Sequence, residues 1–170
     1  MTHLPRLALS VRQPWAYAIA AGWKDIENRD WRQSNPGLKF RDAVAIHAST
    51  GMTQDEYWGA TSTFRHCGFT CPPPHELVRG AIIGTAEIVD IVKDSDSPWF
   101  FGRIGLVIAN ARLLDEPIPC SGALGFFEWK RSGEIAKPAK WMLAKSEAAP
   151  QPDSGPWLFG SRGNCGGYDG

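Results

Sequence analysis

The 170-residue sequence has no hydrophobic run long enough to cross a bilayer and no surplus of either charge. A membrane-spanning helix needs about 18 or more consecutive apolar residues, and the chain contains no such run. The N-terminus also lacks the charged region and long apolar stretch of a secretory signal. We therefore expect a soluble cytoplasmic protein without a membrane partner.

Charge is balanced overall but unevenly distributed. Lysine and arginine together number 18, as do aspartate and glutamate. Proteins that follow long duplexes present a broad basic surface, and this balance argues against that class. Residues 1–41 nevertheless carry a net +4 and residues 42–97 a net −5. This pattern fits a small cleft that recognises a nucleotide or a short single-stranded segment, or else charges scattered over a solvated surface.

Local signatures of nucleophilic catalysis and of metal binding are missing or weak. No Gly-x-Ser-x-Gly motif occurs, and His47 beside Ser49 is not evidence of a nucleophile with its base. Residues 66–75 contain two histidines and two of the four cysteines. Adjacent His66 and Cys67 can seldom both reach one ion, and three prolines stiffen the intervening chain. We expect no metal, no disulfide and no organic cofactor.

The most informative positive feature is the segment 22–29, which places four ionisable side chains within six residues. An apolar helix precedes it, predicted from about Pro14 to Ala21, because proline suits the first turn of a helix. A strand is predicted from Asp25 to Trp31. Its alternation places Glu27 and Arg29 on one face, and a bulge at the turn would bring Lys24 round to join them.

Further strands and a second helix complete the predicted architecture. Strands are expected at residues 7–11, 43–48, 81–92 and 104–109, with the strand-rich part ending at Pro117 and Pro119. Thr53 and Glu56 have the spacing of a capping box, which predicts a helix from there to about Phe64. The three residues expected to supply its buried surface are Tyr57, Trp58 and Phe64. Strands mixed with two or three helices, without βαβ repeats, indicate an α+β fold whose sheet could close into a small barrel.

Four ordered segments carry a resemblance to a known family. The pattern Gly-x-Lys-x-x-Glu-x-Arg at residues 22–29, together with Leu-Ser-Val-Arg-Gln-Pro-Trp at 9–15, Ala-Ile-His-Ala-Ser at 45–49 and Gly-Ala-Leu-Gly-Phe-Phe-Glu-Trp at 122–129, resembles the ASCH domain family of the PUA-like superfamily. The likeness is to stand-alone bacterial members and covers about residues 4–129. It implies a PUA-like mixed β pseudo-barrel.

This resemblance divides the chain into an ASCH domain, residues 1–129, and a C-terminal extension, residues 130–170, which is first basic and then rich in proline and glycine. Apolar clusters at 141–143 and 157–159 could dock the extension onto the barrel. An irregular segment that covers hydrophobic surface is favoured over a basic tail that contacts nucleic acid.

The family is widely regarded as an RNA-binding or nucleic-acid-binding one, with a cleft between the first helix and the barrel. The resemblance therefore implies a pocket that reads RNA, another single strand or a modified nucleoside, in a protein expected to be monomeric. Arg12 could hold a phosphate near exposed N–H groups of the first helical turn, and an aromatic ring could stack on a base. The candidate ligand-binding residues are Arg12, Trp15, Lys24, Glu27, Arg29, Trp31 and His47.

An enzyme remains the alternative. Some ASCH-like proteins are amidohydrolases on acylated cytidine that use the motif lysine and a threonine three residues later, and others are described as ribonucleases. The third residue after Lys24 is Glu27, which cannot replace a hydroxyl nucleophile. In a different hydrolysis, Glu27 would be the general base for water, and Lys24 or Arg29 would stabilise the oxyanion. Lys24 and Glu27 are the candidate catalytic residues in that case.

Overall fold

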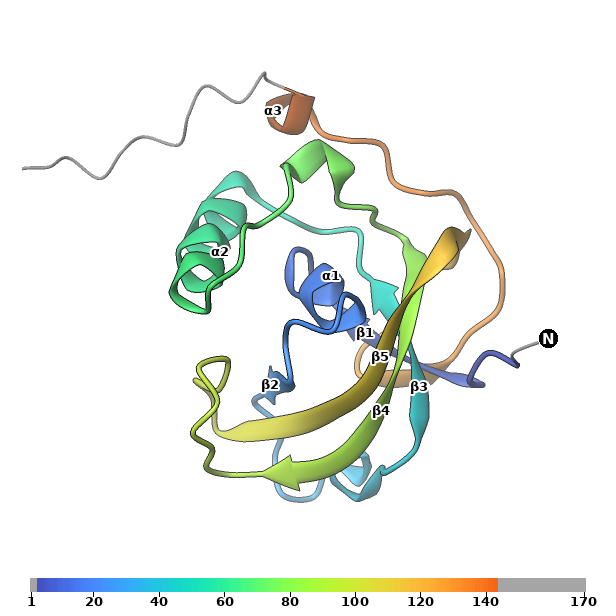
Figure 1. Ribbon diagram of the computed structural model, residues 1–170. Helices are drawn as coiled ribbons and strands as arrows, with labels where there is room; N and C mark the ends of the chain where they lie inside the picture. Colours follow the sequence, from blue (N-terminus) through green and yellow to red (C-terminus); the bar gives the residue numbers. More distant parts are fainter. Residues whose placement is uncertain (1–2, 144–170) are drawn as a thin grey trace, which may run out of the picture.

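The computed structural model describes residues 3–143, which form a curved sheet with helices on it (Figure 1). The elements, in chain order, are β1 Leu7–Val11, α1 Trp15–Ala20, β2 Ile26–Arg29, a 3₁₀ helix Pro36–Lys39, β3 Ala43–Ala48, α2 Gln54–His66, a second 3₁₀ helix Pro74–Glu76, β4 Ala81–Val92, β5 Ile104–Pro119, β6 Phe126–Glu128 and α3 Lys140–Leu143.

One six-stranded sheet, with the order β2-β5-β4-β3-β1-β6, curls around α1 (Figure 1). Strands β1 and β3 are parallel, and the other neighbours are antiparallel. The curl brings β2 back towards β1, and Arg29 on β2 donates a hydrogen bond to the Ser10 carbonyl at 2.8 Å. The predicted α+β, PUA-like pseudo-barrel is confirmed.

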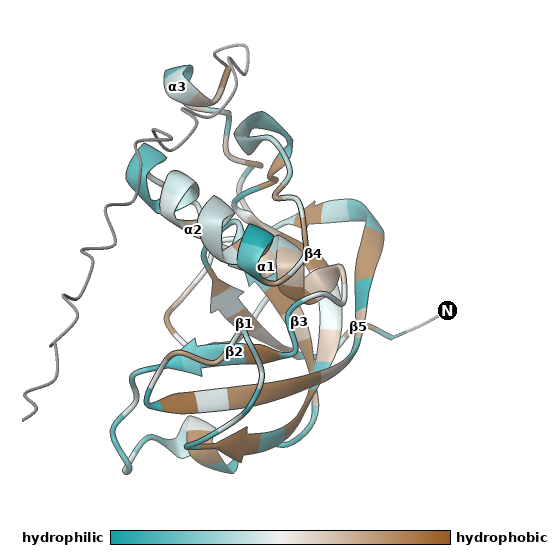
Figure 2. Ribbon diagram, turned by 60° about the vertical axis from the view of Figure 1, so that its left-hand side comes forward, coloured by the Kyte–Doolittle hydropathy of each residue, from teal (hydrophilic) through white to brown (hydrophobic). Residues whose placement is uncertain are grey.

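The main core lies between α1 and the concave face of the sheet. Ile19 on α1 packs with Leu9, Ile46 and Leu106, all of them fully buried. Figure 2 shows apolar residues concentrated in the strands, whereas α2 is mostly hydrophilic. No helix among the described residues is long and apolar enough to cross a membrane.

Close contact between α1 and β4 requires glycine at position 84. A Cβ atom on Gly84 would lie 2.6 Å from both the Ala20 Cβ and the Arg112 carbonyl oxygen. The absence of a side chain therefore allows the end of α1 to lie directly on β4.

The capping box of α2 forms as predicted. The Thr53 hydroxyl accepts from the Glu56 N–H, and the Glu56 carboxylate accepts from the Thr53 N–H. Tyr57 and Phe64 are buried, but the expectation for Trp58 is wrong, because this side chain is 36% exposed. Trp58 lies one position off the helical face that Tyr57 and Phe64 share, and Ala60 is buried there instead.

The last two strands differ from the sequence prediction. β5 continues through Pro117 to Pro119, and it pairs with β4 up to Pro119 with several shifts of register on the way. β2 pairs with only the first part of β5, residues 104–107, so the prolines lie where β5 has a free edge and a missing N–H is tolerated. The short β6 then pairs with β1 and adds a strand that the sequence did not predict.

The start of the C-terminal extension packs against the barrel. The Ala136 N–H donates to the Arg79 carbonyl, and the Arg79 guanidinium donates to the Lys137 carbonyl at 2.8 Å. Met142 is buried with Tyr57 and Leu77. The cluster at 141–143 thus docks in part, through Met142 and Trp141, while the one at 157–159 lies outside the described residues.

Candidate functional site

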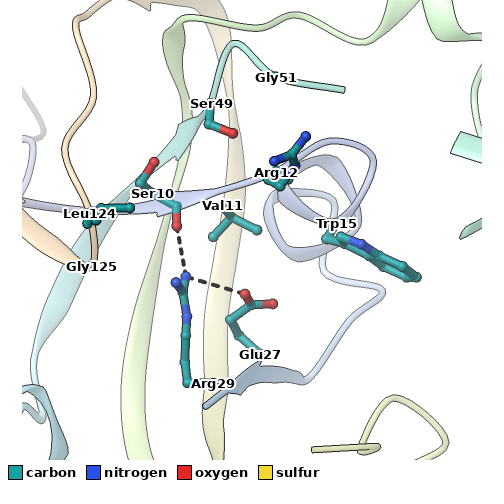
Figure 3. Close-up of a pocket in the computed structure, with 10 residues that line it drawn as sticks. All are labelled: Ser10, Val11, Arg12, Trp15, Glu27, Arg29, Ser49, Gly51, Leu124 and Gly125. Carbon is teal, nitrogen blue, oxygen red and sulfur yellow. Dashed lines mark hydrogen bonds and ion pairs between the residues drawn. The ribbon is translucent and has the colours of Figure 1, made fainter. Parts of the chain in front are cut away.

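A pocket of about 500 Å³ lies where the start of α1 faces β2 and the end of β1 (Figure 3). Trp15 and Leu124 lie on opposite sides of it, with Glu27 and Arg29 between them. The lining residues are Ser10, Val11, Arg12, Trp15, Glu27, Arg29, Ser49, Gly51, Leu124 and Gly125. Four of the sequence-predicted site residues therefore come together in one cavity.

The charged segment forms a compact ion cluster on one wall of the pocket. The Lys24 Nζ lies 3.0 Å from the Glu27 Oε2, and the Arg29 Nη2 lies 3.3 Å from the Glu27 Oε1. Lys24 also donates to the Ile26 carbonyl, and its side chain is only 1% exposed. The predicted grouping of the three side chains is confirmed by these contacts. Lys24 reaches Glu27 from the turn before β2, without a bulge in that strand.

Glu27 and Lys24 occupy different depths. Glu27 lines the pocket, whereas Lys24 lies beneath it and is not among the lining residues. The turn that directs Lys24 inward is fixed by Gly22, which has a φ of +76°, and by a hydrogen bond from the Lys24 N–H to the Ala18 carbonyl. Lys24 therefore holds the Glu27 carboxylate in place from below.

Arg29 connects three parts of the site. Its guanidinium contacts Glu27, donates to the Ser10 carbonyl, and lies 5.6 Å from the centre of the Trp31 ring. Its Nε is buried without a hydrogen-bond partner among the described residues. Trp31 does not line the pocket and packs instead against Phe126, so it orients Arg29 from behind.

Arg12 lies at the pocket rim in an ion pair with α2. Its Nη2 is 2.7 Å from the Glu56 Oε2, and its side chain is 52% exposed. The Thr53 backbone N–H, and to a smaller degree the Arg12 charge, lower the pKa of Glu56. Arg12 is therefore held in position by the N-terminal turn of α2 while much of its guanidinium remains open to a ligand.

Three N–H groups at the start of α1 are not free to assist Arg12 in binding an anion. The N–H groups of Ala16, Tyr17 and Ala18 donate to the Arg12 carbonyl, the Gln13 side chain and the Pro14 carbonyl. Gln13 is buried and donates in turn to the Val78 carbonyl at 2.7 Å. These donors are thus occupied by the protein itself.

Trp15 lines the pocket, and its ring packs against buried aromatic side chains. Its ring centroid lies 5.7 Å from that of Phe64 and 6.4 Å from that of Trp99. Trp99 is itself 2% exposed and belongs to the core. Of the two tryptophans among the candidate ligand-binding residues, Trp15 lines this cavity and Trp31 does not.

His47 lies behind the pocket wall. Its Nε2 donates to the Cys120 carbonyl at 3.0 Å, and its Nδ1 is 3.1 Å from the Ser10 hydroxyl. Because a carbonyl only accepts, this arrangement fixes the tautomer and leaves Nδ1 as the acceptor for the Ser10 O–H. Burial lowers the pKa of His47. The neutral ring thus ties β1 and β3 to the segment that carries Leu124.

Ser10, Ser49 and Leu124 line the pocket and were not predicted as site residues. Ser10 and His47 are register partners on the parallel strands β1 and β3, and nothing local in the sequence indicates that pairing. Leu124 precedes Gly125, which has a φ of +68°. A glycine is the residue type that most readily adopts this angle, so it was a sign of a turn that the sequence did contain.

Among residues 3–143 no group of three or more His, Cys, Asp or Glu is placed to hold a metal ion. Cys67 and Cys71 are free thiols, and burial raises the pKa of Cys71 to about 12.

Comparison with known proteins identifies the family and one human relative. The ASCH domain matches residues 9–143, a span that includes every lining residue and α3. The human protein Activating signal cointegrator 1 is 26% identical over 155 residues, which cover 83% of this chain and 25% of the human protein. The chain thus spans about a quarter of the length of that relative.

Proposed function

Because the chain belongs to the ASCH domain family, we propose that it is a nucleic-acid-binding module, which holds one nucleotide of RNA or of another single strand in the pocket between α1 and the barrel. The observation that carries the proposal is the Glu27 carboxylate, which is fixed between two cations and lines the same pocket as Trp15. The pocket volume lies within the roughly 300–1,000 Å³ range of small-ligand sites.

Each lining side chain offers one part of nucleotide recognition. Arg12, at the rim, can donate to a phosphate oxygen in a charge-assisted hydrogen bond. Glu27 can accept from an exocyclic amine or a ring N–H. Trp15 offers a flat apolar surface on which a base can stack. Lys24 acts through Glu27 and makes no contact with the ligand.

A matched pair of arginine variants tests this proposal. Arg12 and Arg6 each form a half-exposed or exposed ion pair with a glutamate, at 2.7 and 3.0 Å, but Arg6 lies outside the pocket lining. Fluorescence anisotropy with labelled single-stranded RNA and DNA oligonucleotides would measure affinity. Arg12→Ala should weaken binding about tenfold because a charge-assisted hydrogen bond is lost, while Arg6→Ala should not. Equal effects of the two variants would argue against a ligand in this pocket.

The second candidate is a hydrolase that acts on a nucleoside or on RNA, either as an amidohydrolase of an acylated base or as a ribonuclease. It is favoured by one observation, namely that the Glu27 carboxylate lines the cavity and could activate a water molecule there. The buried position of Lys24 favours a positioning role over contact with the reacting atoms. Incubation with acylated nucleosides and RNA, followed by product analysis, tests this candidate. Product that disappears in Glu27→Gln would establish the enzyme.

A further inference from the structure

A second aromatic ring lies beside Trp15, outside the lining of the pocket. Phe101, in the loop between β4 and β5, is 59% exposed, and its ring centroid lies 6.1 Å from that of Trp15 at an interplanar angle of 56°. Nearby Phe64 and Trp99 are buried beneath Trp15. Phe101 thus extends the aromatic surface of the pocket outwards into solvent.

The main chain around Phe101 is held in place by β2. The Phe101 N–H donates to the Asn28 Oδ1 at 3.0 Å, and the Asn28 Nδ2 donates to the Trp99 carbonyl at 2.8 Å. Asn28 lies between Glu27 and Arg29 in the sequence, so one short strand positions both the ion cluster and the exposed ring. The two hydrogen bonds of Asn28 therefore fix the position of the Phe101 main chain relative to the pocket.

The charges of the pocket match a phosphodiester. Lys24 and Arg29 against Glu27 leave a net +1, while Arg12 and Glu56 neutralise each other. A phosphodiester carries one negative charge, and a terminal phosphate carries nearly two at neutral pH. The site therefore complements a phosphate that links two nucleosides better than one that ends a nucleotide.

We propose that Phe101 stacks the base adjacent to the nucleotide held in the pocket, so that the ligand is a single strand of at least two nucleotides and not a free nucleotide. This inference rests on the proposed function. Trp15 and Phe101 then form two neighbouring stacking surfaces, and the linking phosphate lies near the cationic groups. Such stacking tolerates any base, whereas Glu27 reads the base inside the pocket.

Calorimetric titrations with dinucleoside monophosphates (ApA, UpU) and with the mononucleotides 5′-AMP and 5′-UMP test the inference. The wild-type protein should bind the dinucleoside monophosphates more tightly. Phe101→Ala should weaken the binding of dinucleoside monophosphates about tenfold and leave the affinity for the mononucleotides unchanged. Phe101→Trp, which keeps an aromatic ring, should bind the dinucleoside monophosphates as tightly as the wild type. Leu113→Ala, which removes another exposed apolar side chain (44% exposed) outside the pocket lining, is the matched control and should change neither.

The outcomes separate this inference from the function on which it rests. If mononucleotides and dinucleoside monophosphates bind equally well, or if Phe101→Ala leaves the preference intact, the second stacking surface is excluded while the pocket remains a nucleotide site. If none of these compounds binds the wild type, and longer RNA and DNA do not bind either, the proposed function itself is contradicted.

Discussion

At the scale of single residues, the site depends on a buried lysine that does not line the pocket. Lys24 neutralises Glu27 from below, and the same carboxylate is contacted by Arg29 from the side. A buried ion pair that loses one partner leaves an uncompensated charge. The lysine of the family motif therefore has a structural role in this chain, whatever the ligand is.

Lys24→Met should lower the free energy of unfolding by about 3 kcal/mol, because Glu27 keeps Arg29 but loses its buried partner. Chemical denaturation would measure the change. Lys93→Met is the control, since Lys93 is exposed and its replacement should have little effect. An unchanged stability in Lys24→Met would show that the Glu27 carboxylate does not need Lys24.

His47 should make stability depend on pH. Burial lowers its pKa in the folded protein, so below the unfolded pKa of about 6.5 the unfolded chain takes up a proton that the folded chain does not. The contribution of neutral His47 to the free energy of unfolding is thus fully present above about pH 6.5, and it is lost as pH falls through the pKa of His47 in the folded protein. Denaturation at several pH values should show a smaller pH dependence in His47→Gln than in the wild type. An identical dependence in both proteins would contradict this role.

At the scale of elements, the contact of α1 with β4 positions the pocket. Gly84→Ala should destabilise the protein by about 1–3 kcal/mol, since the new methyl group meets Ala20 and the Arg112 carbonyl at 2.6 Å. Gly59→Ala, in the middle of α2 where a Cβ meets nothing within 4 Å, should instead stabilise it by about 0.5–1 kcal/mol. Thermal melts of the two variants should move in opposite directions, and a loss of stability in both would contradict the account.

Elements set by local signals were predicted well from the sequence. The capping box fixed the start of α2, and the alternation of β2 put Glu27 and Arg29 on one side. The extent of β5 and the buried face of α2 depend instead on contacts between segments that are distant in the sequence. β5 continues through Pro117 and ends at Pro119 because β4 pairs with it on one side while its other edge is free. Trp58 is exposed because the neighbours of α2, and not its composition alone, determine which face is buried.

At the scale of the whole molecule, the pocket combines residues from distant parts of the chain. Arg12, Trp15, Glu27 and Arg29 were predictable because they lie close together in the sequence and fold as one local unit. Ser49 and Leu124 reach the same cavity through the pairing of β1 with β3 and β6. Both residues lie in segments that carry the family resemblance, but the sequence does not show that these segments meet at the pocket. The predicted boundary at residue 129 stays a prediction, although Met142 packs against Tyr57 of α2 and against Leu77.

The balanced charge of the chain predicts a weak dependence of binding on salt. With one phosphate of a single strand neutralised at the pocket, the logarithm of the association constant should fall with a slope of about −0.7 against the logarithm of salt concentration. Anisotropy titrations at several salt concentrations measure this slope. A slope steeper than about −4 would indicate a broad basic surface in place of a small pocket.

The central claim is that this pocket holds a nucleotide, and the most direct test is ¹⁵N–¹H NMR of the protein titrated with a short single-stranded RNA. The account predicts saturable shifts in the residues of the pocket, in β2 and in the loop that carries Phe101. Shifts confined to residues 130–143, or to the outer face of α2, would contradict it.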